Sequence, residues 1–120
     1  MIDTLLVLDD DTFNLRSLKR VLKGTFYEML VAQSTQQAEE LLRTHQVTHV
    51  LCDRNLSEST RGEEVIRLWR ARWRTIRYAA LMTGDDTQEL EGLPSIDAVF
   101  AKPIDPAALR EALTAARRGR

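Results

Sequence analysis

The sequence predicts an α/β protein built on a single doubly wound parallel sheet, and three observations support this fold class. Short apolar segments alternate with longer amphipathic ones five times along the 120 residues, which is the order of β-α units with right-handed crossovers. The first apolar segment, residues 5–8, has no polar alternation, which indicates a strand buried on both faces. Polar residues follow directly where the apolar segments end. We therefore expect a (βα)5 sheet with helices on both faces.

The predicted strands are short and apolar, and they cover residues 2–8, 27–32, 48–52, 76–82 and 96–101. Helices are predicted between them by apolar residues at helical spacing, over residues 12–23, 35–45, 62–73 and 106–116, with only a short helix over residues 85–91. Gly24 is a natural stop for the first helix. Ser34 and Gln37 have the spacing of a capping box for the second. Asp105 and Pro106 form a typical start for the last.

The composition fits one domain covering residues 1–120 and argues against several classes of protein. Hydrophobic residues make up 43% and charged residues 29%, and the net charge is −1, so nothing draws the chain to nucleic acid or to a membrane surface. No apolar run approaches the roughly 18 residues of a membrane span, and no signal peptide opens the chain. The single cysteine, Cys52, excludes an internal disulfide. We expect a cytoplasmic protein whose residues 117–120 form a frayed tail.

Polar side chains stand at the ends of four predicted strands: Asp9 and Asp10, Asp53, Thr83, and Lys102. Because the carboxyl ends of parallel strands lie at one edge of a sheet, these side chains are expected to meet. Three consecutive carboxylates after the first strand favour a bound cation, and oxygen ligands suit a hard one such as Mg²⁺. Such clustered carboxylates should also raise at least one carboxyl pKa in the metal-free protein.

These residues, taken together and in order, resemble the receiver domain of two-component response regulators. The matching features are an acidic pair after the first strand, an aspartate closing the third, Thr83 and Gly84 closing the fourth, and Lys102 and Pro103 closing the fifth. The resemblance covers the whole chain. It implies a flavodoxin-like sheet of strand order 2-1-3-4-5 and transfer of a phosphoryl group from a histidine kinase to an aspartate.

The resemblance implies that Asp53 is the phosphoacceptor. It also implies that Mg²⁺ is bound by Asp10, by Asp53 and by the backbone carbonyl of Asn55, with Asp9 holding the metal through water. Phosphoryl transfer depends mainly on positioning and on neutralising the equatorial oxygens, and a metal in this place would contribute to that neutralisation.

The remaining site residues have roles implied by the same resemblance. The Thr83 hydroxyl would bond a phosphoryl oxygen, and Gly84 would leave room for the phosphoryl group. The Lys102 ammonium would act as a flexible point charge on that group. Pro103 favours a fixed turn that aims Lys102 inward, with the peptide bond between them either trans or cis.

Two positions bear on the lifetime of a phosphoaspartate. Asn55 lies two residues after Asp53, and Asp85 lies two residues after Thr83. Both resemble receivers in which water reaches the phosphoryl group readily. We expect a lifetime of seconds to minutes.

Three features depart from the family pattern. The loop over residues 54–61 lacks the usual proline and looks about one residue longer than usual. The segment between Thr83 and Lys102 is short. Val99 occupies the position of the family's switch aromatic, and Phe100 falls on the next, oppositely facing position. The usual rotation of an aromatic ring behind Thr83 therefore has no obvious residue to perform it.

The expected partners are a histidine kinase or phosphotransfer protein as donor and an effector that the sequence does not identify. The domain is expected to accept a phosphoryl group and not to turn over as an enzyme. The exposed face of the last helix, with Arg110 and Glu111, leaves a homodimer open. Arginines over residues 67–77 suggest nucleic-acid binding, but helical spacing favours core tryptophans, Trp69 and Trp73, beneath a solvated basic face.

Three other functions are compatible with parts of the sequence. An interaction module that keeps the fold without phosphorylation is suggested by Val99 and by the unusual loop. A small Mg²⁺-dependent phosphatase is suggested by the spacing of Asp9 and Asp11, although Thr12 comes one position early and there is no room for a cap domain. A flavodoxin would have to cradle a phosphate after the first strand, where the aspartates would repel it.

Overall fold

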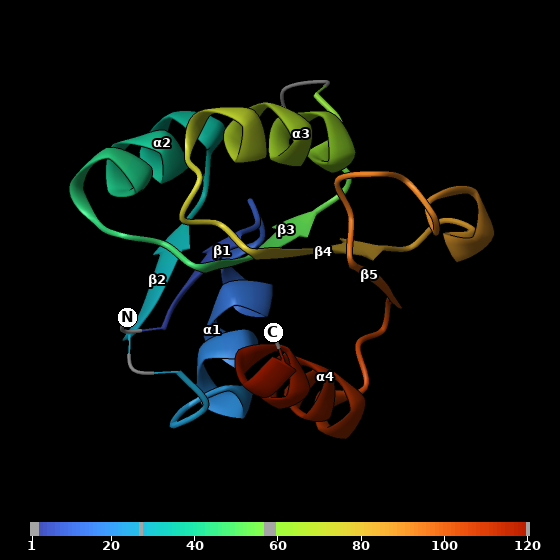
Figure 1. Cartoon of the computed structure of the whole chain (residues 1–120). Helices are drawn as coiled ribbons and strands as arrows, with labels where there is room; N and C mark the ends of the chain where they lie inside the picture. Colours follow the sequence, from blue (N-terminus) through green and yellow to red (C-terminus); the bar gives the residue numbers. More distant parts are fainter. Residues whose placement is uncertain (1–2, 27, 57–59, 120) are drawn as a thin grey trace.

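The computed structural model describes residues 3–26, 28–56 and 60–119, which form one five-stranded parallel sheet with helices on both faces (Figure 1). The strands lie in the order β2-β1-β3-β4-β5, and each neighbouring pair is parallel. The predicted doubly wound fold and its strand order are confirmed. The strands are β1 Thr4–Leu8, β2 Glu28–Ala32, β3 His49–Asp53, β4 Tyr78–Thr83 and β5 Ala98–Ala101.

The five predicted strands are all present, and their ends differ from the predicted ones by at most two residues. Strands β1 and β3 are buried along their whole length because they lie inside the sheet, under helices on both sides. Strands β2 and β5 lie at the two edges and are only partly buried. Residues 2 and 27, predicted to begin the first two strands, lie outside the described residues.

The described residues contain α1 Thr12–Val21, α2 Thr35–Thr44, α3 Gly62–Arg72, the 3-10 turn η1 Thr87–Glu89, and α4 Pro106–Gly119. The short helix predicted over residues 85–91 is therefore a single 3-10 turn. Helix α1 ends two residues earlier than predicted, and the chain then turns through Gly24. That residue has a φ of 83°, a conformation that glycine adopts without steric cost.

The prediction of a frayed tail is wrong for residues 117–119, which continue helix α4. The Arg117 guanidinium donates to the Asp3 carboxylate at 2.9 Å and also to the carbonyl of Thr25. These bonds attach the end of the last helix to the start of the sheet. Arg120 lies outside the described residues.

Side-chain caps fix the starts of three helices, and those of α2 and α4 were predicted from the sequence. The Asp11 carboxylate accepts from two backbone N–H groups in the first turn of α1. At α2, the Ser34 hydroxyl accepts from the backbone N–H of Gln37 at 3.1 Å, and the Gln37 side chain accepts from the N–H of Gln33 at 2.6 Å. The Asp105 carboxylate caps α4 in the same way. These bonds pair backbone donors that a helix start leaves without partners.

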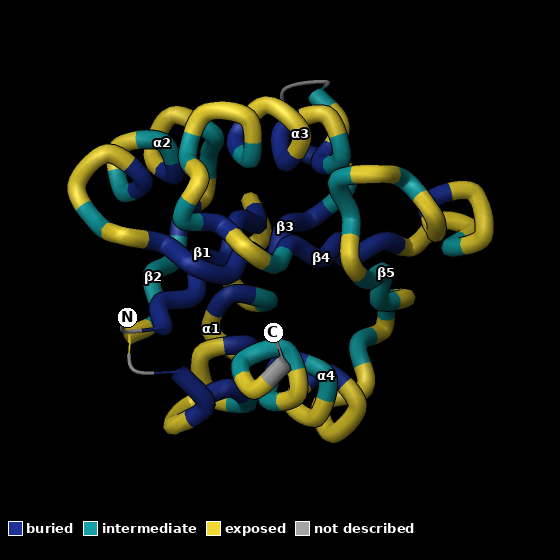
Figure 2. The backbone as a smooth tube through the Cα atoms, viewed as in Figure 1, coloured by how far each residue is buried: buried dark blue, intermediate teal, exposed yellow. Residues whose placement is uncertain are grey.

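The sheet separates two hydrophobic cores, with α2 and α3 on one face and α1 and α4 on the other (Figures 1 and 2). Successive residues of β1 enter the two cores in turn, because side chains alternate across a strand. Leu6 and Leu8 pack under α2 and α3, whereas Leu5 and Val7 pack over α1 and α4. This arrangement explains why the first strand has no polar alternation.

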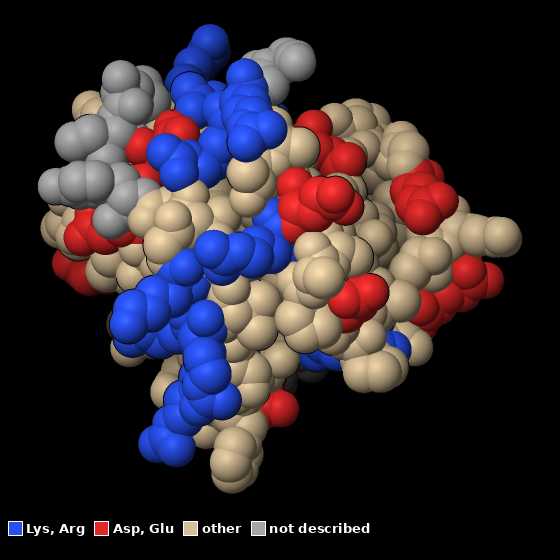
Figure 3. Space-filling model, turned by 90° about the horizontal axis from the view of Figure 1, so that it is seen from below, with Lys and Arg blue, Asp and Glu red and all other residues tan. Residues whose placement is uncertain are grey.

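Of the three arginines predicted on a solvated face, Arg67 and Arg74 are exposed and Arg70 is partly exposed. Trp69 is buried in the core under α3, and Trp73 packs against that core. Arg70 forms an ion pair with Asp97. The opposite face, over α1 and α4, also carries a stripe of basic side chains (Figure 3), whose exposed members include Arg16, Lys19, Arg20, Lys23, Arg110 and Arg118. None of the described helices is long and apolar enough to cross a membrane.

Candidate functional site

The predicted site residues meet at the carboxyl edge of the sheet, as the strand ends require. Asp53 is the last residue of β3 and Thr83 the last of β4. Asp9 follows β1 directly, and its backbone N–H bonds to the carbonyl of Ala32 at 3.1 Å. Lys102 follows β5, and its backbone N–H donates to the carbonyl of Thr83 at 2.8 Å. The sheet itself thus fixes the backbone at each of these positions.

Three carboxylates form the acidic part of the site, and we call Asp9, Asp10 and Asp53 the acidic trio. One oxygen from each lies within 4.8 Å of the others. Asp9 and Asp53 are buried, whereas Asp10 is exposed at the mouth of the site. An all-oxygen donor set of this size fits Mg²⁺, which is usually bound by one or two carboxylates together with water.

The Asp9 carboxylate is held by its own chain. One oxygen accepts from the backbone N–H of Asp11 at 2.9 Å, and the other accepts from the side-chain amide of Asn14. Burial raises the pKa of Asp9, the neighbouring Asp53 charge raises it further, and the two hydrogen bonds oppose that rise. The predicted rise of a carboxyl pKa in the cluster is therefore confirmed, with burial as its main cause. Asn14 was not predicted as a site residue, although its place in the first turn of α1 puts it beside the end of β1.

The Asp53 side chain is only 7% exposed and faces a cation. The Lys102 ammonium lies 3.1 Å from its Oδ1 atom. The peptide bond between Lys102 and Pro103 is cis. The ion pair shows that Lys102 is aimed inward at the carboxylate, as the sequence predicts.

Thr83 is completely buried beside Asp53. Its hydroxyl oxygen accepts a hydrogen bond of 2.9 Å from the backbone N–H of Asp85. At Gly84, between them, a side chain would meet no atom within 4 Å. The structure therefore leaves open space at Gly84, and the role of this residue in making room for a phosphoryl group stays a prediction.

A group of polar side chains connects the segment after β3 with the segment after β4. The Asp85 Oδ2 atom accepts from Arg54 and from the Asn55 side-chain amide, each at 3.1 Å. The Arg54 guanidinium also holds both oxygens of Glu63 in the first turn of α3, at 3.1 to 3.3 Å. We call Arg54, Asn55, Glu63 and Asp85 the clasp. Sequence reasoning found Asn55 and Asp85 but missed Arg54 and Glu63, whose spacing has no helical or strand period.

The segment after β3 runs close to the start of α3. Asn55 and Arg61 form an isolated antiparallel bridge, in which the N–H of Gly62 bonds to the carbonyl of Arg54 at 2.8 Å. The bridge thus uses the carbonyl of Arg54 and not that of Asn55, which is the predicted metal ligand. Residues 57–59, where the loop was expected to be one residue longer than usual, lie outside the described residues.

Val99 and Phe100 point to opposite faces of the sheet, as predicted from the sequence. Val99 packs against the core under α2 and α3, and Phe100 packs against the core over α1 and α4. Cys52 is also buried, and burial raises the pKa of its thiol. It donates to the carbonyl of Asp53 at 3.3 Å and serves as a packing residue.

The fold and the site together define a doubly wound α/β protein with an acidic pocket closed by a threonine and a lysine. The sequence profile of the response regulator receiver domain matches residues 5–114. The chain therefore belongs to the response regulator receiver domain family. No curated protein sequence matches it.

Solved structures of receiver domains share the fold. The N-terminal signal receiver domain of a two-component system response regulator from Bacteroides fragilis has 22% identity and a TM-score of 0.84, with 100% of both chains covered. The signal receiver domain of an HD domain-containing protein from Pseudomonas fluorescens Pf-5 has 23% identity and a TM-score of 0.82, covering 94% of this chain and 92% of the other. A CheY-like receiver domain protein from Methanospirillum hungatei JF-1 has 24% identity and a TM-score of 0.79, with 94% and 91% covered. At these identities the likeness concerns the fold alone.

Proposed function

We propose that the protein is a phosphoacceptor of a two-component or phosphorelay system, and that Asp53 receives the phosphoryl group. The observation that carries this proposal is the position of the Asp53 carboxylate, between the Lys102 ammonium at 3.1 Å and the oxygens of Asp9 and Asp10 within 4.8 Å. A nucleophile beside a lysine ammonium and a cation-binding cluster suits phosphoryl transfer, which needs positioning and charge neutralisation above all.

In the proposed reaction, an Asp53 oxygen attacks the phosphorus of a phosphohistidine. A phosphorus–oxygen bond forms and the phosphorus–nitrogen bond breaks, and its electron pair stays on the ring. A ring protonated on its other nitrogen leaves as neutral imidazole. Lys102 lies close enough to Asp53 to follow the charge onto the phosphoryl oxygens, since its ammonium is a mobile point charge.

The metal supplies neutralisation of the phosphoryl charge when it is bound. Asp10 and Asp53, with the backbone carbonyl of Asn55, would hold Mg²⁺. Asp9 has both oxygens in hydrogen bonds to its own chain, which suits a residue that holds the metal through water. The Thr83 hydroxyl, whose oxygen accepts from the backbone N–H of Asp85, would donate its own proton to a phosphoryl oxygen.

The donor in this proposal is a histidine kinase or a phosphotransfer protein in the cytoplasm. The domain acts as a stoichiometric acceptor and not as an enzyme with turnover. Its output passes to an effector through a change of surface. Asn55 and Asp85 favour a phosphoaspartate that lasts seconds to minutes.

The test is the intact mass of the protein after incubation with acetyl phosphate and Mg²⁺, for the wild type and for Asp53→Asn. We expect the wild type to gain one phosphoryl group and the variant to gain none. The variant keeps the size of the side chain and removes the nucleophile. A gain of mass in both proteins would place the acceptor elsewhere.

A second candidate function is a receiver that signals by contact without phosphorylation. The low exposure of Asp53 and the complete burial of Thr83 favour it, because both groups are closed off in this state. No mass gain in the wild type, with Mg²⁺ binding measured separately, would support this function. A phosphatase that uses Asp9 as its nucleophile is disfavoured, since both oxygens of that carboxylate are occupied by hydrogen bonds.

A further inference from the structure

The Asp9 carboxyl group has no exposed surface and lies beside the carboxylate of Asp53. Burial of a carboxylate is costly unless hydrogen bonds replace those lost with water. Among the described residues, two donors reach Asp9: the backbone N–H of Asp11 at Oδ1, at 2.9 Å, and the side-chain amide of Asn14 at Oδ2. Two bonds at different oxygens fix the orientation of the carboxylate, whereas the first alone would leave it free to turn.

The start of α1 places Asn14 at this carboxylate. Asp11 is the N-cap of the helix, and its own carboxylate accepts from the backbone N–H groups of Phe13 and Asn14, at 3.0 and 3.4 Å. The cap thus fixes the first turn, from which the Asn14 side chain reaches back to Asp9. The end of β1, the helix cap and the acidic trio are therefore joined in one hydrogen-bonded network.

An amide suits this position better than a charged or an apolar side chain. A carboxylate in place of Asn14 would add to the repulsion within the acidic trio, and an apolar side chain would leave Oδ2 of Asp9 without this donor. An amide donates a hydrogen bond and adds no charge. It therefore holds the Asp9 carboxylate while the negative charge of the acidic trio stays available to a cation.

The remaining surface of Asn14 is open to a groove. The groove runs between α1 and the segment after β5, and its lining includes Asn14, Ser17 and Lys102. Loss of the Asn14 side chain would therefore enlarge an open groove, and it would not create a buried cavity of the kind that destabilises a core. The contribution of Asn14 thus lies in its hydrogen bond to Asp9 more than in packing.

We propose that Asn14 is a positioning residue of the metal site, which raises the affinity for Mg²⁺ by holding the Asp9 carboxylate in one orientation. This inference rests on the proposed function, in which the acidic trio binds Mg²⁺ and Asp9 holds the metal through water. A water bridge depends on the direction of the carboxylate oxygens, because hydrogen bonds weaken steeply when they are misaligned. A carboxylate that is free to turn has to be ordered when the metal binds, and this lowers the affinity.

The experiment measures thermal unfolding over a range of Mg²⁺ concentrations at constant ionic strength, from which the affinity for Mg²⁺ follows by mass action. We expect Asn14→Ala to bind Mg²⁺ about tenfold more weakly than the wild type, the lower end of the usual effect of residues that orient the groups of a metal site. Asn14→Leu keeps the bulk without the amide and should show the same loss, whereas Asn14→Gln keeps the amide and should recover part of the affinity. The matched control is Ser17→Ala, in the next turn of α1 and the same groove, which should bind Mg²⁺ like the wild type.

The same titration separates positioning from a merely structural role. A merely structural Asn14 would lower the melting temperature equally at every Mg²⁺ concentration and leave the affinity unchanged, which would overturn the inference. Tighter Mg²⁺ binding in Asn14→Ala would also overturn it, because the amide would then compete with the metal for the charge of Asp9. If Asn14 acts through Asp9, then Asn14→Ala adds no further loss of affinity to Asp9→Ala, whereas multiplied losses in the double variant would contradict this route.

The affinity is measured without a phosphoryl donor, so the role of Asn14 and the proposed function can fail separately. A wild type that gains no mass from acetyl phosphate would refute the phosphoacceptor role of Asp53, while a tenfold loss of Mg²⁺ affinity in Asn14→Ala would still support the role of Asn14. A wild type that gains mass, with equal Mg²⁺ affinities in the wild type and Asn14→Ala, would refute the role of Asn14 alone. A wild type that Mg²⁺ does not stabilise at all would overturn the inference together with the proposed metal site.

Discussion

At the residue scale, the acidic trio places three carboxylates close enough to repel one another. Asp10 is exposed, but its carboxylate lies within 4.8 Å of the buried Asp9 and Asp53. Two unit charges about 4 Å apart interact by about 1 kcal/mol even in water, so Asp10 should lower the stability of the metal-free protein. A bound divalent cation should reverse that effect by binding the folded state alone.

Asp10→Asn should therefore raise the melting temperature of the metal-free protein by a few degrees and abolish its stabilisation by Mg²⁺. Thermal unfolding with a chelator and with excess Mg²⁺ measures both effects. Glu111→Gln removes an exposed carboxylate from α4 and serves as the control, which should melt like the wild type in both conditions. A melting temperature that is unchanged or lower in metal-free Asp10→Asn would contradict the electrostatic argument.

The residues of the site differ in how far the sequence predicts them. Those at strand ends, such as Asp53, Thr83 and Lys102, are predictable because a parallel sheet brings the ends of its strands to one edge. Asn14 and Arg54 act through contacts whose geometry depends on the packing of α1 and α3. No local period marks them, and so only the structure reveals their role.

At the scale of elements, the junction between β3 and α3 depends on the absence of a side chain at Gly62. A Cβ atom there would lie 2.6 Å from the carbonyl oxygen of Asp53 and 3.0 Å from Cα of Arg54. Both of these are backbone atoms and cannot rotate away. The close approach places the first turn of α3 against the strand that ends in Asp53.

Overpacking at Gly62→Ala should cost about 1–3 kcal/mol, and the gain in helix propensity should offset up to about 1 kcal/mol of it. We therefore expect a net destabilisation of up to about 2 kcal/mol. Urea unfolding measures the change. Gly84→Ala is the control, since a side chain there meets nothing within 4 Å, and it should stay within about 0.5 kcal/mol of the wild type. Equal stability of the two variants would show that the junction relaxes at little cost.

The elements themselves were largely predictable, because burial of β1 and β3 on both faces leaves a continuous apolar pattern. The ends of the helices were less predictable from the sequence. Helix α1 stops where the Arg110 side chain bonds to the carbonyls of Val21 and Lys23. Helix α4 continues because Arg117 reaches Asp3. Both ends are set by contacts more than 80 residues apart in the chain, which local sequence signals do not contain.

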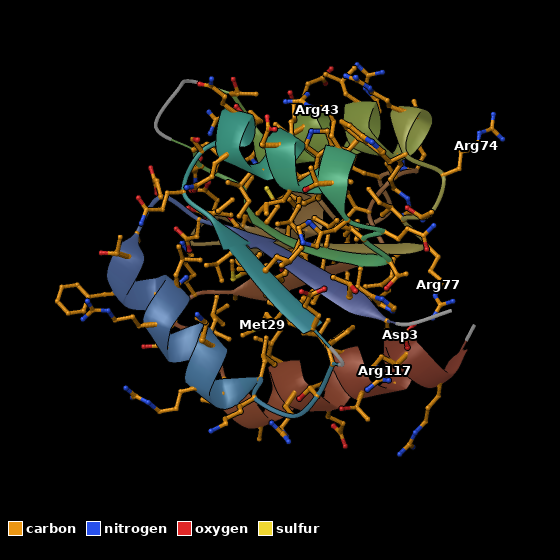
Figure 4. The ribbon with its side chains drawn as sticks, turned by 90° about the vertical axis from the view of Figure 1, so that its left-hand side faces the viewer. Asp3, Met29, Arg43, Arg74, Arg77 and Arg117 are labelled. Carbon is orange, nitrogen blue, oxygen red and sulfur yellow. The ribbon has the colours of Figure 1, made fainter. Side chains whose placement is uncertain are left out.

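At the scale of the whole molecule, the edge of the sheet opposite the site is held by charged residues from distant segments. Asp3 accepts from both Arg77 and Arg117, and these side chains converge near the start of β1 (Figure 4). Next to them, His49 is completely buried at the start of β3. It faces the rings of Phe26 and Tyr78, at centroid distances of 4.9 and 5.8 Å.

Among the described residues, the buried His49 has a hydrogen-bond partner on only one of its two ring nitrogens. Nδ1 lies 2.7 Å from the hydroxyl of Thr48, whereas Nε2 is buried without a hydrogen-bond partner. The Thr48 hydroxyl donates its proton to the carbonyl of Thr4, which leaves Nδ1 of His49 as the donor to the Thr48 oxygen.

Burial lowers the pKa of His49 below its usual value of 6.5, and the charges of Arg77 and Arg117 lower it further, against the opposing effects of the Ala116 carbonyl and Asp3. The unfolded chain therefore binds a proton at a higher pH than the folded protein does. As the pH falls through 6.5, the free energy of unfolding should decrease by up to about 1.4 kcal/mol per pH unit, and this loss should stop below the lowered pKa.

His49→Leu removes the titrating group, so the wild type should lose more stability than this variant between neutral pH and pH 5. Urea unfolding across that range measures the difference, with Tyr78→Phe as the control that keeps His49 and should follow the wild-type slope. Parallel stability profiles for the wild type and His49→Leu would show that the ring takes up its proton without disturbing the fold.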